Sequence, residues 1–187
     1  VSKAIATVIC NNWRKQSGKV ELINFMDTVL INTKQSERGK LQSAARQALS
    51  HYQDKTVTKL KEDPYRIWSF SSFKLAEHLA SAMKIPKDDL RRLVCAFEEV
   101  LFMHLDSAST QVSYPNFSKD LEELLGDSNL VLPALTAAIE SSKCDVPRII
   151  ITEPQDAEKM SESERLAKTK FALPGTAIME NYVAAQL

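Results

Sequence analysis

The chain has 187 residues, of which 44% are hydrophobic and 26% are charged. This is the composition of an ordinary globular protein, and a domain near this length buries roughly 70% of its unfolded surface, so neither a disulfide nor a metal is needed for stability. The 24 basic and 24 acidic side chains balance, so no net field draws the chain to nucleic acid or to a membrane.

Cysteine usage and hydropathy exclude further classes of protein. Cys10, Cys95 and Cys144 are far apart and form no CxxC or Cys/His cluster, so we expect reduced thiols, no metal site and a cytoplasmic location. No apolar run approaches the roughly 20 residues that span a bilayer, and no signal peptide is visible. We therefore expect no membrane contact. A start at Val1, without a methionine, suggests a piece of a longer protein.

The first third of the chain has helical periodicity. Only four glycines occur, which favours helices joined by short turns over a β-rich fold. Apolar residues recur at helical spacing over residues 5–13, and Gly18 predicts a break after them. Further apolar stripes over residues 20–30 and 41–52 predict two more helices.

Prolines mark the ends of the next two helices. A short helix over residues 55–61 is expected to end at Asp63, because Pro64 disfavours helical geometry in the residue before it. Apolar spacing over residues 75–83 predicts another helix, which stops before Pro86.

A long apolar helix is expected next. Asp88 or Asp89 is a candidate cap for it. Its predicted buried face consists of Leu93, Ala96, Phe97, Val100, Leu101, His104 and Leu105. Tyr114-Pro115 separates it from short helices around residues 121–125 and 132–139.

The pattern changes near the C-terminus. Residues 148–152 are rich in β-branched side chains and predict a strand, and residues 168–173 are a second candidate strand. The polar segment 153–167 between them is either a mobile insertion or a short solvated helix. Pro174 precedes a closing helix that reaches residue 185. The coarse expectation is therefore a set of helices followed by a small two-stranded wing.

The sequence lacks the motifs of an independent enzyme. A P-loop requires GxxxxGK(S/T); Gly39-Lys40 has Lys34 in place of the first glycine and Leu41 in place of the hydroxyl residue. GxSxG, HExxH and the Rossmann glycine pattern are also missing. The histidines are scattered, and His104, on an apolar face, is expected to be a hydrogen-bonded core histidine. We predict no catalytic residue.

One stretch is more specific. It contains LKEDPYRI at residues 60–67, SSFKLAEHLA at 71–80 and KIPKDD at 84–89. These segments resemble the L-x-E-(D/N)-P-Y-R-L segment, the G-I-G-F-x-x-A-D-x-(I/L)-A hairpin and the (L/M)-G-I-P-x-D turn that precede the motor of RecD/TraA-type superfamily 1 DNA helicases. The rest of the chain resembles the same region in collinear order.

The resemblance implies a mainly α fold: a helix-hairpin-helix-like bundle with a small C-terminal winged-helix-like β-hairpin. It implies the end of a preceding helix-hairpin-helix unit at residues 1–18 and a hairpin-containing helical domain at residues 19–110. Residues 111–187 would be a winged-helix-like segment with a linker helix into a motor domain. No cofactor is expected here, whereas ATP and magnesium are expected for the motor of the parent, a bacterial helicase of repair or conjugation.

The resemblance also implies a DNA-binding site. Its candidate residues are Arg66, Ser71, Ser72, Lys74, Lys40 and Arg46. In the family's hairpin, glycines let backbone amides approach phosphate, but Phe70, Ser71 and Ser72 hold the matching positions. Two outcomes stay open: serine hydroxyls and Lys74 replace the contact, or it is lost.

Each candidate also has a structural interpretation. Arg66 could brace the Pro64 turn, paired with Glu62. The basic cluster that contains Lys40 and Arg46 could be a solvated helix face. Nearby aromatic side chains could stack on unpaired bases, although aromatic residues so close to a helix start are more often core residues. These aromatic side chains are Tyr65, Trp68, Phe70 and Phe73.

Two functions follow from the sequence. The first is a non-catalytic accessory domain that braces the motor and guides or weakly contacts single-stranded or forked DNA. The second is a protein-docking module of a helicase or conjugative relaxase, which the neutral charge and the glycine-free hairpin favour. A stand-alone enzyme is disfavoured by the missing motifs.

Overall fold

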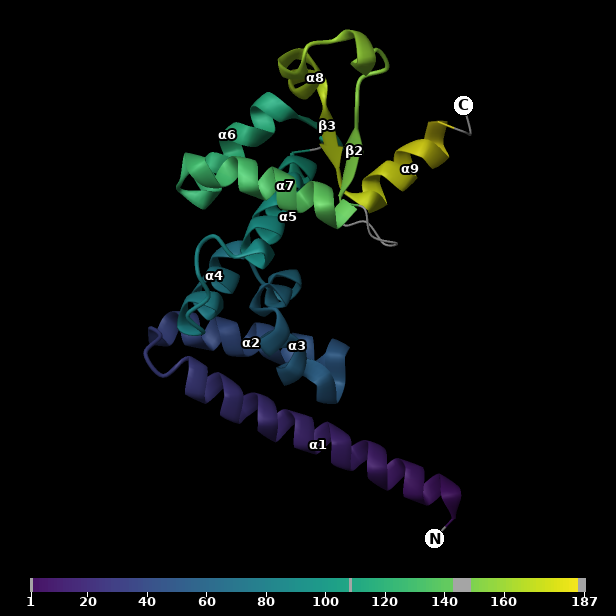
Figure 1. The fold of residues 1–187 in the computed structure, drawn as a ribbon. Coiled ribbons are helices and arrows are strands. Elements are labelled where there is room, and N and C mark those ends of the chain that lie inside the picture. Colours follow the sequence, from purple (N-terminus) through teal and green to yellow (C-terminus); the bar gives the residue numbers. More distant parts are fainter. Residues whose placement is uncertain (1, 108, 143–148, 185–187) are drawn as a thin grey trace. The chain divides into compact units, whose positions relative to one another are not determined.

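The computed structural model describes residues 2–107, 109–142 and 149–184. The chain forms two compact units, Val1–Lys87 and Asp88–Leu187. Figure 1 labels their helices and strands. Cys144 and Arg148, together with the last residues of the predicted closing helix, lie outside the described residues.

The first unit is built from helices. In chain order they are α1 (Lys3–Val29), α2 (Gln35–Tyr52), the 3-10 turn η1 (Gln53–Lys55), α3 (Thr56–Glu62), the 3-10 helix η2 (Pro64–Phe70) and α4 (Phe73–Ala82). The helices α2, α3 and α4 all pack around η2. Leu41, Leu60, Ile67 and Leu79 are fully buried there, so the Pro-Tyr-Arg segment forms the centre of this unit's core.

The break predicted at Gly18 is wrong. The first helix, α1, runs without interruption for 27 residues, and Figure 1 shows it as one long purple helix. Gly18 is buried, and a Cβ added to it would lie 3.1 Å from the Cα of Asp54 in η1. Glycine is therefore used here for a close approach between α1 and η1, and not to end the helix.

The predicted ends of α3 and α4 are confirmed. Asp63 is extended, with φ −151°, and its carboxylate accepts a 3.0 Å hydrogen bond from the amide of Tyr65 at the start of η2. The final helix of the unit, α4, ends at Ala82, ahead of Pro86. Pro64 thus ends α3 at the position that the sequence predicts, and the structure adds a cap by Asp63 at the start of η2.

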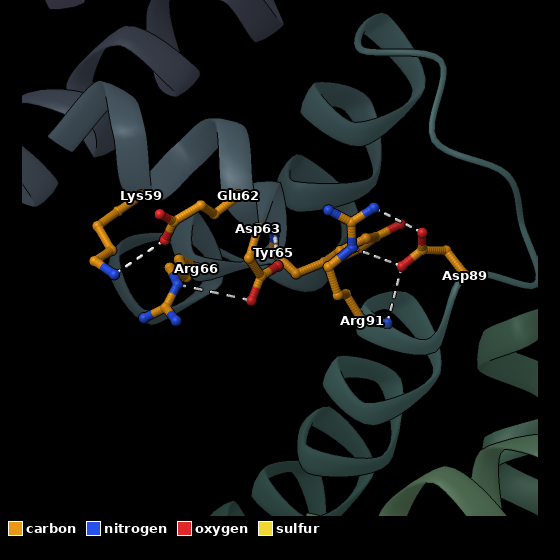
Figure 2. Close-up of polar contacts among 7 residues, drawn as sticks. All are labelled: Lys59, Glu62, Asp63, Tyr65, Arg66, Asp89 and Arg91. Atoms are coloured by element: carbon orange, nitrogen blue, oxygen red, sulfur yellow. Dashed lines mark hydrogen bonds and ion pairs between the residues drawn. The ribbon is translucent and has the colours of Figure 1, made fainter. Parts of the chain in front are cut away.

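The second unit combines helices with a small sheet. Its elements are α5 (Leu90–Asp106), β1 (Val112–Ser113), α6 (Tyr114–Leu125), η3 (Ser128–Leu130), α7 (Val131–Ser142), β2 (Ile150–Thr152), η4 (Ala157–Lys159), α8 (Glu162–Lys168), β3 (Lys170–Ala172) and α9 (Pro174–Ala184). Of the two candidate caps, Asp89 caps α5. Its carboxylate accepts hydrogen bonds from the backbone amide and guanidinium of Arg91, the former at 2.9 Å (Figure 2).

Three phenylalanine rings form the centre of this unit. Phe97 of α5 lies with its ring centroid 4.1 Å from Phe117 of α6 and 5.2 Å from Phe171 of β3. All three side chains are buried. The predicted buried face of α5 is confirmed as far as Leu101, whereas His104 and Leu105 are only half-buried. His104 Nε2 lies 2.7 Å from a carboxylate oxygen of Asp120, as expected for a partnered histidine.

The C-terminal wing is confirmed and is larger than predicted. The two expected strands, β2 and β3, pair antiparallel, with Ile151 opposite Phe171. A third strand, β1, pairs with the other side of β3, with Val112 also opposite Phe171. The polar segment between β2 and β3 contains α8, which begins with a capping box between Ser161 and Glu164. The solvated-helix interpretation of that segment is therefore correct.

Within the residues that the structure places, no helix combines the length and apolar character needed to cross a bilayer.

Candidate nucleic-acid interface

The two units carry opposite charges. Residues 1–87 contain 15 basic and 7 acidic side chains, a net charge of +8, whereas residues 88–187 contain 9 basic and 17 acidic ones, a net charge of −8. The neutrality of the whole chain thus conceals one strongly basic unit. Such a difference in net charge between two parts of a chain is typical of proteins that bind a polyanion through the basic part. Counting charges by region would have found it in the sequence.

All six predicted DNA-binding residues belong to the basic unit. Arg66 lies in η2, Ser71 and Ser72 form the hairpin between η2 and α4, and Lys74 lies in the first turn of α4. The helix that carries Lys40 and Arg46, α2, packs against both η2 and α4.

The hairpin does not require glycine. Ser71 and Ser72 both have negative φ, −152° and −134°, so neither position needs the left-handed backbone that favours glycine. The hydroxyl of Ser71 donates a 2.8 Å hydrogen bond to the carbonyl of Ile67. The hydroxyl of Ser72 accepts a hydrogen bond from the amide of Leu75 at 3.4 Å, so its own proton can still be donated. Ser72 is therefore the hydroxyl better placed to meet a phosphate oxygen.

Arg66 is held loosely beside the hairpin. Its Nε lies 3.9 Å from a carboxylate oxygen of Asp63, and its side chain is 40% exposed. The expected partner, Glu62, forms a 3.0 Å ion pair with Lys59 (Figure 2). Because a guanidinium has five N–H donors, the contact with Asp63 leaves Arg66 able to donate to a phosphate as well.

The other three basic residues among the DNA-binding candidates are exposed, but they do not form one continuous stripe on the surface. Lys40, Arg46 and Lys74 are all exposed. Arg46 is six positions after Lys40, which places the two residues roughly 120° apart around α2. Arg38, which also lies on α2, forms a 2.7 Å ion pair with Asp27 of α1. A basic surface exists here, but the predicted cluster is not a single contiguous row.

The aromatic side chains divide into two groups. Tyr65 and Phe73 are buried and stack on each other, which confirms the core interpretation for these two. Phe70 is half-buried. Its ring centroid lies 5.9 Å from those of both His51 and Tyr52, which are 4.7 Å apart. This three-ring cluster joins the hairpin to the C-terminal end of α2.

A polar groove that the sequence did not reveal lies at the same C-terminal end of α2. It has a volume of about 540 Å³ and is lined by Asn11, Asn12, Arg14, Leu49, Ser50, Gln53 and Asp54. It opens on the N-terminal side of Gly18, where α1 and η1 come into close contact. The side chains of His51 and Tyr52 follow directly after the lining residue Ser50.

A comparison with protein families agrees with this geometry. Residues 26–108 match the model of the ATP-dependent RecD2 DNA helicase HHH (helix-hairpin-helix) domain. The match includes all six predicted DNA-binding residues. No curated protein matches the chain. Residues 26–108 are therefore similar to the helix-hairpin-helix domain of ATP-dependent RecD2 DNA helicases, and this similarity supports an N-terminal region of RecD-type helicases.

Proposed function

We propose that the basic unit, residues 1–87, is a non-catalytic DNA-contacting module of an ATP-dependent helicase. The observation that carries the proposal is its net charge of +8, found in the unit that holds the hairpin. Phosphate neutralisation by basic side chains supplies most non-specific affinity for DNA. An accessory module of this kind would hold DNA weakly while the motor does the mechanical work.

The hairpin is the proposed centre of contact. Arg66 and Lys74 flank it with positive charge, and the hydroxyl of Ser72 offers a donor at the start of α4. The N-terminal end of α4 adds a partial positive charge from the helix dipole. These groups would bind the sugar-phosphate backbone of a single strand or a fork without sequence specificity. Lys40 and Arg46 would extend the positive field along α2.

The acidic unit has a different proposed role. With a net charge of −8, residues 88–187 repel phosphate, so we propose that they face the motor and brace it. ATP and magnesium would belong to that motor, since this sequence contains no GxxxxGK(S/T) segment to hold them. The parent helicase would work on DNA in the cytoplasm.

The salt dependence of DNA binding tests the proposal. For a single strand, the logarithm of the affinity falls by about 0.7 per phosphate contact for each unit of log salt concentration. Replacing both Arg66 and Lys74 with glutamine should therefore flatten the slope by about 1.4. Lys159→Gln is the matched control, because Lys159 is 84% exposed and belongs to the acidic unit. An unchanged slope in the double variant would refute the hairpin contact.

A protein-docking role is the second candidate, and one observation favours it. Ile5, Val8, Ile9 and Trp13 form a stripe on α1 and are all more than half exposed. An exposed apolar stripe of this length is typical of a surface that packs against another protein. Co-purification of the chain with the motor region of its parent should then be lost in Val8→Asp and retained in the hairpin double variant.

A further inference from the structure

The polar groove beside α1 lies outside the hairpin contact. It is formed where residues 11–14 of α1 meet the C-terminal end of α2 and η1. Asp54, one of its lining residues, lies close to α1 at Gly18, where an added Cβ would be 3.1 Å from the Cα of Asp54. With a volume of about 540 Å³, it falls within the roughly 300–1,000 Å³ range of small-ligand sites. One nucleotide fits a space of this size.

The lining chemistry suits a nucleobase better than a phosphate. Three side-chain amides, from Asn11, Asn12 and Gln53, present paired donors and acceptors. Side-chain amides of this kind form two parallel hydrogen bonds with a base edge. The carboxylate of Asp54 also lines the groove. It would repel a phosphate but can accept a hydrogen bond from an amino group of a base.

Three aromatic rings indicate how an unpaired base could reach the groove. His51 and Tyr52 continue directly from the lining residue Ser50, and Phe70 connects their rings to the hairpin. Tyr52 and Phe70 are half-buried and His51 is exposed. Aromatic rings next to a basic surface are the usual platform on which unpaired bases stack. The three rings thus lie between the hairpin and the groove in the order of the chain, since His51 and Tyr52 stand between the lining residues Ser50 and Gln53, and Phe70 directly precedes Ser71.

We infer that this groove receives an unpaired base of a DNA strand whose backbone lies on the hairpin. The inference rests on the proposed DNA-contacting function and names its ligand: a single strand with accessible bases, not a fully paired duplex. Arg14 at the groove would contact the neighbouring phosphate, and the amides would hold the base edge.

Oligomers with and without bases separate this inference from phosphate binding. A deoxycytidine oligomer and an abasic oligomer of equal length carry the same phosphates, so only contacts with the bases distinguish them. We expect the full chain to bind the deoxycytidine oligomer about tenfold more tightly, a difference of about 1.4 kcal/mol, which is the size expected of a pair of hydrogen bonds to one base edge. The double variant Asn11→Ala/Asn12→Ala should reduce that ratio to less than about twofold.

Asn24→Ala is the matched control, because Asn24 is an exposed asparagine of the same helix that does not line the groove. It should keep the full ratio. Equal binding of both oligomers by the unmodified chain would overturn the inference and leave the proposed function intact. A ratio that persists in the double variant would also overturn it, because the base would then be held elsewhere. No binding of either oligomer at low salt would overturn both proposals.

Discussion

Two glycines in helices provide a matched test of the fold of the basic unit. Gly18 lies in α1 and Gly39 in α2. A Cβ at Gly39 would meet nothing within 4 Å, whereas a Cβ at Gly18 would lie 3.1 Å from the backbone of Asp54. Gly18→Ala and Gly39→Ala therefore make the same chemical change in two different environments.

The expected difference follows from two opposing effects. Alanine is more favourable than glycine in a helix interior by about 1 kcal/mol, so Gly39→Ala should stabilise the unit by up to that amount. The same gain exists at Gly18, but η1 must move away from the new methyl group. Gln53, next to Asp54, already has a φ of +54°, and its carbonyl accepts a 2.6 Å hydrogen bond from Thr56. Because this turn is constrained, we expect overpacking of about 1–3 kcal/mol and a net loss of stability in Gly18→Ala.

Tryptophan fluorescence can follow this unit selectively. Both tryptophans of the chain, Trp13 and Trp68, belong to residues 1–87. Urea titrations monitored by their emission should give a midpoint above the wild-type value for Gly39→Ala and a midpoint below it for Gly18→Ala. Equal stabilisation by the two substitutions would show that α1 does not approach η1 as described, and the groove that both segments line would then not be formed.

Two further predictions concern the acidic unit. Asp89→Ala should destabilise it by about 1 kcal/mol near neutral pH, because the cap of α5 is lost. The hydrogen bond from the Arg91 side chain lowers the pKa of Asp89 below its ordinary value of 3.8. The stabilisation by Asp89 is therefore complete above that value and is lost as the pH falls through the lower pKa of the folded state. Circular-dichroism melts of wild type and variant should converge in acid, and a gap that persists there would contradict the assignment. Phe97→Ala should cost about 3–5 kcal/mol, because Phe97 packs against Phe117 and Phe171. Amide hydrogen exchange in β3 should accelerate accordingly, and unchanged exchange would be inconsistent with this core.

The helix ends were predictable because their signals are local. Asp63-Pro64 restricts its own backbone, and Asp89 accepts a hydrogen bond from a residue two positions away. The role of Gly18 was not predictable, since it depends on Asp54, far along the chain. The short strand β1 escaped prediction for the same reason: its two residues are extended only because they pair with β3.

The candidate site was predictable in part. The Pro-Tyr-Arg segment and the hairpin were located by resemblance, and the family match covers them. The sequence left open whether the hairpin forms without glycine, and the negative φ of Ser71 and Ser72 shows that its backbone does not require glycine at these two positions. The groove brings Asn11 and Asn12 next to Gln53, which no local pattern reveals. The domain limits proposed at residues 18 and 110 stay predictions.

The central claim is that DNA meets this chain through its basic unit. Hydrogen–deuterium exchange of the full chain, with and without a single-stranded oligomer at low salt, tests it most directly. The account predicts that protection concentrates around residues 66–74 and in α2, and that residues 88–187 exchange as before. Protection confined to residues 88–187, or no protection at a DNA concentration that saturates binding, would contradict it.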